Sequence, residues 1–151
     1  MKRTSTYFPK PGETADAWQV IDATGKTLGR MARDISMALQ GKDRPTYTPH
    51  VNTGSHVVVI NAGKVRVTGR KLLQKTYYKH TGYIGHLRTY LLRDMLETRP
   101  ERVIQLAVKG MLPRNTMGRE MLKRLKVYPG DSHPHDAQVK AAAKQSENQM
   151  V

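Results

Sequence analysis

The spacing of apolar residues along the chain predicts short strands that alternate with amphipathic helices. Between residues 27 and 40 the apolar side chains recur three and four positions apart, which is the period of one helical face. Thr27 stands where an N-cap residue belongs, and Gly41 stands where a glycine ends many helices. Residues 18–22 predict a strand before this helix. Residues 57–60 are Val-Val-Val-Ile, a run typical of a strand that is covered on both faces.

The second half of the chain predicts further helices. Residues 90–98 and 100–112 have helical character, and the second of these segments has a proline in its first turn. Asn115 or Thr116 is placed to cap a basic helix that runs to about Leu125.

Four segments have weaker patterns. Residues 65–68 alternate, which fits either a short strand or an irregular segment, and residues 69–88 lack apolar periodicity, so we interpret them as a long structured loop. Residues 126–128 predict a last short strand. Beyond residue 136 the composition fits a helix or a frayed end, and we expect disorder there.

The order of these elements predicts a small three-layer α/β/α domain with a mainly parallel sheet. The connection between the first two strands is long enough for a right-handed crossover. We expect three parts: an extended N-terminal arm over residues 1–16, a single α/β domain over residues 17–136, and a flexible C-terminal tail over residues 137–151.

Charge narrows the choice of partner. The chain has 26 lysines and arginines against 12 acidic residues, and residues 63–128 hold sixteen of the basic residues but only four acids. Such an excess favours an anionic partner, because it is otherwise self-repelling. A membrane is disfavoured, since the longest purely apolar run is residues 57–60. With no cysteine and no apolar leader at the N-terminus, we expect a cytoplasmic protein that binds nucleic acid.

The residues that carry enzyme chemistry are not arranged as a catalytic or cofactor site requires. Gly25-Lys26-Thr27 resembles part of a phosphate-binding loop, but the required first glycine is Val20 here, and a G-x-G-x-x-G pattern is absent. His133 and His135 are the tightest histidine pair, without a second cluster at metal-ligand spacing. We therefore expect no catalytic residue, no cofactor, no metal and no small-molecule substrate.

Basic side chains gather in two stretches, and in the first of them they interleave with aromatic side chains. Residues 70–80 place lysines and arginines beside Tyr77 and Tyr78, a pattern that suits phosphate contact and base stacking. The alternative is that the tyrosines pack on the core, and we expect one of the two to be buried. In the basic helix, apolar residues face the core and the cations lie on the outer stripe.

Several motifs together resemble the bacterial large-subunit ribosomal protein thirteen family. They are TLGR (27–30), YTPH (47–50), VVVINAGKVRVTG (57–69), YYKHTGY (77–83), ERVI (101–104), GMLP (110–113), LKVY (125–128) and HPH (133–135). The likeness runs from about Trp18 to Gln138. It implies an α/β fold around a four-stranded parallel sheet, with basic loops and extended termini. It also implies a structural role in the large ribosomal subunit: binding large-subunit ribosomal RNA, helping to fold it during assembly, and adjoining neighbouring large-subunit proteins without forming a homo-oligomer.

The candidate RNA-binding residues come from two sources. The resemblance places these residues in the family's basic or polar motif positions: Arg30, Lys42, Arg44, His50, Arg70, Lys71, Lys79, His80, Lys109, Arg114, Arg119, Lys123 and Arg124. The YTPH motif of the same resemblance adds Tyr47, and the pattern of charge and aromatic rings adds Lys75, Tyr77, Tyr78 and Lys126. We further expect that changing Arg119, Lys123 and Arg124 together to Glu abolishes incorporation into large subunits and leaves the fold intact.

Two other functions remain open from the sequence. A free-standing regulator of messenger RNA or of another protein would use the same basic surface. A nucleotide-binding enzyme would use a Rossmann-like frame, which by itself is a scaffold rather than a sign of a cofactor.

Overall fold

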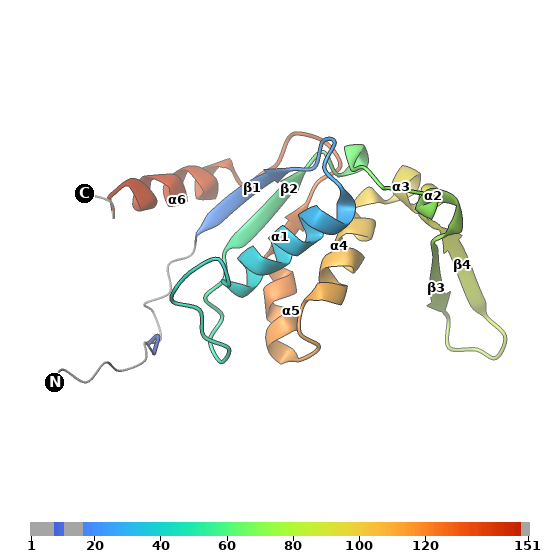
Figure 1. Ribbon diagram of the computed structural model, residues 1–151, viewed down its shortest axis with the longest axis horizontal. Coiled ribbons are helices and arrows are strands. Elements are labelled where there is room, and N and C mark those ends of the chain that lie inside the picture. The colour runs from blue at the N-terminus through green and yellow to red at the C-terminus, as the bar shows by residue number, and fades with distance from the viewer. Residues whose placement is uncertain (1–7, 11–16, 149–151) are drawn as a thin grey trace.

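The computed structural model describes residues 8–10 and 17–148 (Figure 1). In chain order the elements are β1 (Trp18–Asp22), α1 (Leu28–Gln40), β2 (His56–Ile60), the 3₁₀ turn η1 (Ala62–Lys64), α2 (Lys71–Gln74), β3 (Thr76–His80), β4 (Leu87–Leu91), α3 (Leu92–Thr98), α4 (Pro100–Met111), α5 (Thr116–Lys123), β5 (Leu125–Val127) and α6 (Asp136–Asn148). The N-terminal arm expected over residues 1–16 lies outside the described residues apart from residues 8–10.

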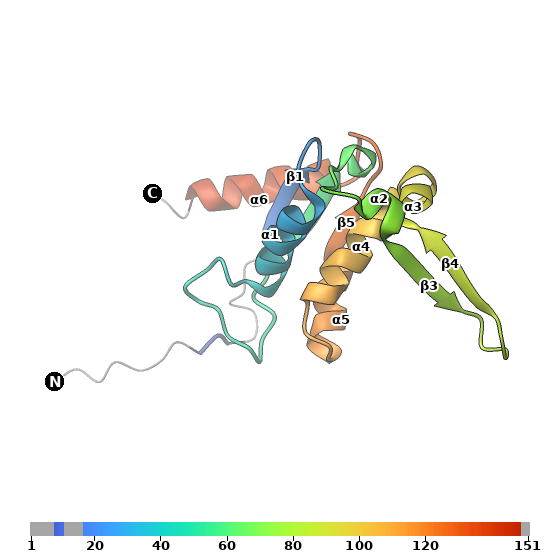
Figure 2. The same ribbon diagram turned by 45° about the vertical axis from the view of Figure 1, so that its right-hand side comes forward.

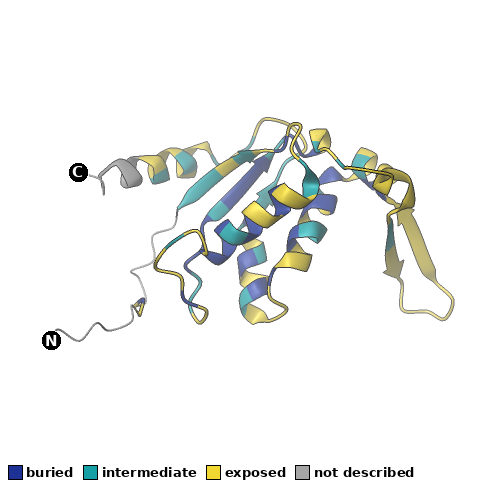
Figure 3. Ribbon diagram, viewed as in Figure 1, coloured by how far each residue is buried: buried dark blue, intermediate teal, exposed yellow. Residues whose placement is uncertain are grey.

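A parallel sheet in the order β1-β2-β5 forms the centre of the molecule. The register pairs Val57 of the middle strand with Leu125, and Val58 with Lys126. Val57, Val58 and Val59 are fully buried, as the β-branched run predicts for a strand covered on both faces. Helices α1, α4 and α5 contact one face of this sheet and each other, and together they enclose the main core (Figures 1 and 3).

Helix α1 follows the predicted spacing closely. Met31, Ile35 and Leu39 lie on its buried face and pack in the main core. Gly41 ends the helix in the left-handed conformation with φ of 73°. Thr27 is the N-cap residue, although its side chain makes no capping hydrogen bond.

Residues 69–88 are not the loop that the sequence suggested. They contain α2 and β3, and β3 pairs with β4 as an antiparallel hairpin that extends away from the sheet (Figure 2). Glycines 82 and 85 have positive φ in the turn, which L-residues adopt at a cost. The helix predicted from residue 90 therefore begins only at Leu92, because Tyr90 and Leu91 belong to the hairpin.

Two further differences concern the sheet and the C-terminal segment. Among the described residues the parallel sheet has three strands, one fewer than the family resemblance implied. Residues 65–68 make a single bridge, between Arg66 and Thr27, instead of a fourth strand. Helix α6 occupies residues 136–148, where the sequence favoured disorder, and it contacts β1.

The start of α6 is held by a group of aromatic rings on the second face of the sheet. Trp18 stacks on His56 with ring centroids 4.5 Å apart, and the ring of His135 lies 5.3 Å from that of Trp18. The hydroxyl of Tyr128 is 2.9 Å from Nε2 of His135. These contacts give residues 128–135 a fixed path, from which α6 continues.

Candidate nucleic-acid interface

The connection between α4 and α5 forms a basic groove. Its volume is about 310 Å³, and its lining includes the cations Lys109, Arg114 and Arg119 without an acidic residue. Asn115 caps α5: its side-chain oxygen accepts a hydrogen bond from the backbone N–H of Gly118 at 2.8 Å. The cap fixes the start of α5, so the three cations project from a corner whose backbone is held by hydrogen bonds.

Gly118 allows this corner to close. A Cβ atom at this position would lie 1.9 Å from the carbonyl oxygen of Pro113, too close for any real contact. The first turn of α5 therefore packs directly against the backbone of the α4–α5 connection. We define the basic corner as Lys109, Arg114 and Arg119 on this frame.

Helix α5 presents different residues to the core and to solvent, as its sequence predicts. Met121 is buried in the main core, and Leu125 is buried just after the helix. Arg119 and Lys123 are exposed. The helix ends at Lys123 instead of about Leu125, because Leu125 enters the sheet as the first residue of β5.

Two of the predicted RNA-binding arginines make contacts inside the protein. Arg124 donates a hydrogen bond from Nη1 to the carbonyl oxygen of Gly54, and Arg44 donates one from Nη2 to the hydroxyl of Ser55 at 2.8 Å. Both side chains thus hold the segment that leads into β2. The expectation that Arg124 can be changed to Glu without harm to the fold needs correction, since the change would place a carboxylate beside a carbonyl oxygen.

The loop after α1 carries three more of the predicted residues. The ammonium of Lys42 lies 5.7 Å from the ring centroid of Tyr47. His50 stacks on Phe8, with ring centroids 4.5 Å apart. Lys42, Tyr47 and His50 remain exposed at this loop, so a cation and two ring systems are available to a partner.

The hairpin places a second group of cations beside aromatic rings. Its register sets Tyr77 opposite Tyr90 and Lys79 opposite Arg88. Because side chains alternate along a strand, these four residues share one face of the hairpin. Tyr78 lies on the other face and is 66% exposed.

Tyr77 joins the hairpin to the body of the protein. Its ring packs against a small second core made by Leu92, Met95 and Val103, and burial raises the pKa of its phenol. The ammonium of Lys75 lies 5.5 Å from the same ring. Tyr77 is thus the more buried of the two tyrosines, in line with the expectation that one of them packs inward.

These basic segments project from the same side of the molecule. In Figures 1 and 2 the loop after α1, the α4–α5 connection and the turn of the hairpin all lie at the lower edge. The turn that joins β1 to α1, by contrast, lies at the upper edge beside η1. A partner that covers the lower edge would meet cations from all three segments.

Comparison with known proteins identifies the family. The family model described as ribosomal protein L13 matches residues 16–134. The chain belongs to the ribosomal protein L13 family. A large ribosomal subunit protein uL13 from Moorella thermoacetica is 56% identical over 134 residues, which cover 89% of this chain and 93% of the relative. Proteins of the same name from Natranaerobius thermophilus and Thioalkalivibrio sulfidiphilus are 54% and 53% identical to this chain. The alignments cover 94% of each relative, and 89% and 88% of this chain, respectively.

The remaining candidate residues of this L13-family chain lie at separate places on it. Arg30 is exposed on the first turns of α1, and Arg70 and Lys71 are exposed at the start of α2. Lys79 is exposed on the hairpin, and Lys126 is half-buried in β5. His80 uses Nδ1 to accept a hydrogen bond from the backbone N–H of Gly82, which helps to form the hairpin turn.

Sequence reasoning missed three residues of this surface. Arg88 and Tyr90 lie beside Lys79 and Tyr77 only because the hairpin pairs them, and Phe8 is found by its stacking on His50. For the first two the available signal was weak: Thr89 and Tyr90 are residue types that favour strands. For Phe8 the sequence carried no such signal.

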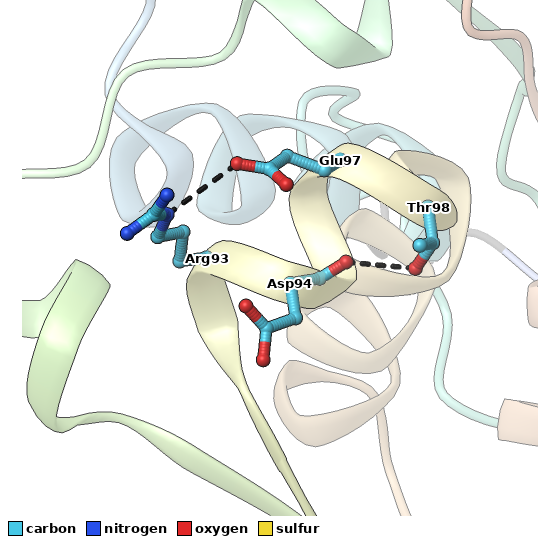
Figure 4. A network of polar contacts seen from close by, with 4 residues as sticks. All are labelled: Arg93, Asp94, Glu97 and Thr98. Atoms are coloured by element: carbon cyan, nitrogen blue, oxygen red, sulfur yellow. Dashed lines mark hydrogen bonds and ion pairs between the residues drawn. The ribbon is translucent and has the colours of Figure 1, made fainter.

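One cation near the hairpin is neutralised within its own helix. Arg93 and Glu97 face each other one turn apart on α3, with Nε and Oε1 at 3.4 Å, while the Thr98 hydroxyl donates to the carbonyl oxygen of Asp94 (Figure 4). Arg93 is therefore a poorer candidate than Lys79 and Arg88 on the hairpin, for which the described part of the chain provides no ion pair.

The described part of the chain provides neither a metal-binding cluster nor a membrane-spanning helix. Within residues 8–10 and 17–148, no group of three or more metal-ligating side chains is placed to hold an ion. None of the helices in that part of the chain has both the length and the apolar character for crossing a membrane.

Proposed function

We propose that this chain is a structural constituent of the large ribosomal subunit that binds large-subunit ribosomal RNA and helps to fold it during assembly. The proposal is supported chiefly by the basic corner, whose backbone packs closely because residue 118 is glycine. The relatives of this chain are named large ribosomal subunit proteins. The proposed location is the cytoplasmic ribosome. The proposed partners are that RNA and neighbouring large-subunit proteins, with a single copy of this chain.

The mechanism is charge neutralisation by cations at fixed positions. RNA helices repel each other through their phosphates, and lysines or arginines that stand between two helices lower that repulsion. Contacts to phosphate fix the register of protein on RNA without reading sequence. A rigid corner, a hairpin and a loop on one side of the protein can each contact a different stretch of RNA, so their fixed spacing favours one arrangement of those stretches.

The proposed role involves no chemical step. A free-standing regulator would use the same cations. It would be distinguished from a ribosomal constituent by its location, because most of the cellular pool would sediment away from ribosomes. A nucleotide-binding enzyme differs in its ligand, since its thermal stability would rise strongly with a free nucleotide.

The experiment tests whether a variant with a charge-reversed basic corner is incorporated into large subunits. The variant carries Lys109→Glu, Arg114→Glu and Arg119→Glu, all at exposed positions. The matched control carries Lys26→Glu, Lys64→Glu and Arg66→Glu, three exposed cations on the turns at the opposite edge. Both proteins are tagged, expressed beside the natural protein and followed through a sucrose gradient.

The corner variant should be folded by circular dichroism and absent from the large-subunit peak, while the control co-sediments with it. If the folded corner variant co-sediments as well as the control does, the basic corner is not the contact that holds the protein on the subunit.

A further inference from the structure

A second groove, like the groove of the basic corner, has more apolar than polar lining. It has a volume of about 430 Å³ and lies between the first turn of α1, the start of α2 and the last two turns of α4. Leu28, Leu92 and Leu106 form much of its floor, and Leu92 is fully buried in the second core. The floor is therefore part of the packed interior and has a fixed shape.

The rim of this groove is cationic. Lys71 and Lys75 line it, no acidic residue does, and Thr27 and Thr68 add hydroxyl groups. The ligand that complements this lining has a flat, largely apolar body, hydrogen-bonding edges and negative charge at one end. A nucleotide has these properties, and the volume lies in the range of pockets that hold small organic ligands.

The groove lies next to the basic corner along α4. Lys109 lines the basic corner, and the next residue, Gly110, lines the apolar groove. The last turn of α4 therefore separates the basic corner from the second groove. An RNA strand that crosses this turn would reach both, and proteins commonly recognise RNA through unstacked bases of single-stranded segments.

We infer that this groove holds one unpaired nucleotide of the bound RNA, with its base against Leu28 and Leu106 and its phosphate near Lys71 and Lys75. The inference rests on the proposed function and deepens it. The basic corner supplies affinity for any RNA backbone, whereas the groove selects RNA that offers an extruded base at the right distance from the corner.

The structure provides a substitution that fills the groove without disturbing the protein. At Gly110 an added Cβ meets nothing within 4 Å, and the residue lies in the last turn of α4 with ordinary helical backbone. Gly110→Leu therefore adds an apolar side chain at the lining of the groove without a clash at its Cβ. Leucine also has a higher helix propensity than glycine, so α4 itself is not weakened.

The control is Gln105→Leu, which adds an apolar side chain to an exposed position of α4 that does not line the groove. Gly29→Leu is a second filling variant: it lies in α1, lines the same groove, and its Cβ also meets nothing within 4 Å. Both filling variants and the control are checked for unchanged or raised melting temperature before binding is measured.

Binding is measured with purified large-subunit ribosomal RNA over a series of salt concentrations. We expect each filling variant to lose about tenfold in affinity while the slope of log Kd against log salt stays unchanged, since no phosphate contact is removed. Gln105→Leu should bind as the natural chain does. Free mononucleotides at millimolar concentration should give no shift in melting temperature.

Four outcomes are distinguished. Loss of affinity in both folded filling variants supports the groove as a nucleotide site. Unchanged affinity in both overturns this inference and leaves the proposed function standing. Tight binding of a free mononucleotide also overturns it, because the occupant would then not come from RNA. If the natural chain itself has no affinity for this RNA, the proposed function fails first.

Discussion

The carboxylate of Asp22 ties the end of β1 to the segment after β2. Its Oδ1 accepts hydrogen bonds from the backbone N–H of Thr24 at 3.0 Å, from the Thr24 hydroxyl at 2.8 Å and from the side-chain amide of Asn61 at 3.0 Å. These bonds, above all the one from the backbone of Thr24, hold the pKa of Asp22 below its ordinary value of 3.8. One carboxylate thus fixes the turn that leads into α1.

The lowered pKa predicts how the contribution of Asp22 depends on pH. The folded state binds the proton more weakly than the unfolded state, so the stabilisation is fully present above about pH 4 and is lost as pH falls through the folded pKa. Asp22→Asn should therefore lower the denaturant midpoint at pH 7, and the difference from the natural chain should shrink at strongly acid pH. A difference that grows on acidification would contradict this assignment.

Gly118 is required by space, not by backbone conformation. Gly118→Ala forces the first turn of α5 away from the carbonyl oxygen of Pro113, and overpacking of this kind costs about 1–3 kcal/mol. Gly63→Ala is the control, because a Cβ there meets nothing within 4 Å. Equal free energies of unfolding for the two variants, measured in urea, would show that α5 moves without cost.

Arg124 and Lys123 are adjacent in sequence and differ in what they contact. Arg124→Ala removes the donor to the carbonyl oxygen of Gly54, a charged hydrogen bond that contributes about 1–3 kcal/mol to folding. Lys123 is exposed, so Lys123→Ala should leave the free energy of unfolding within about 0.5 kcal/mol. Equal unfolding midpoints for the two variants would contradict the structural role of Arg124.

The elements of this fold differ in how visible they are in the sequence. Helices α1 and α4 were predicted because each buries one face, which imposes a helical spacing on its apolar residues. Strand β2 was predicted because it is buried on both faces, which requires a continuous apolar run. The hairpin was missed because little of it is buried: every residue of β4 is exposed, so no alternation between core and solvent marks it. Its pairing is set by the turn and by backbone hydrogen bonds, which leave a weak trace in composition.

The candidate site was predictable in composition but not in geometry. The exposed cations of the basic corner follow from the density of charge in residues 109–119. The inward contacts of Arg44 and Arg124 depend on Ser55 and Gly54, and Gly54 lies 70 positions away from Arg124. No local pattern reports such a contact, so a list of basic residues mixes cations that face a partner with cations that hold the fold.

The two faces of the hairpin give an internal comparison. Tyr77 packs on the second core, so Tyr77→Ala should cost roughly 1–3 kcal/mol of folding free energy through lost packing. Tyr78 is mostly exposed on the other face, so Tyr78→Ala should leave that free energy nearly unchanged. Thermal unfolding of both variants tests the orientation of the hairpin, and a larger loss for Tyr78→Ala would mean that the strand register is shifted by one residue.

Taken together, the chain is a small scaffold whose charge is far from balanced. A net charge of +14 is distributed over 151 residues, and the loop after α1, the turn of the hairpin and the α4–α5 connection lie on one side of the α/β body. Self-repulsion of this size costs the free protein stability, and a polyanion relieves it. The same charge makes affinity for RNA depend steeply on salt.

The most direct test is the salt dependence of RNA binding by a variant in which the basic corner is neutralised. Lys109→Gln, Arg114→Gln and Arg119→Gln together remove three phosphate contacts, so the slope of log Kd against log salt should fall by about two to three relative to the natural chain. Changing Lys26, Lys64 and Arg66 together to Gln should leave the slope unchanged. Equal slopes for the two variants would show that the basic corner does not contact the RNA backbone.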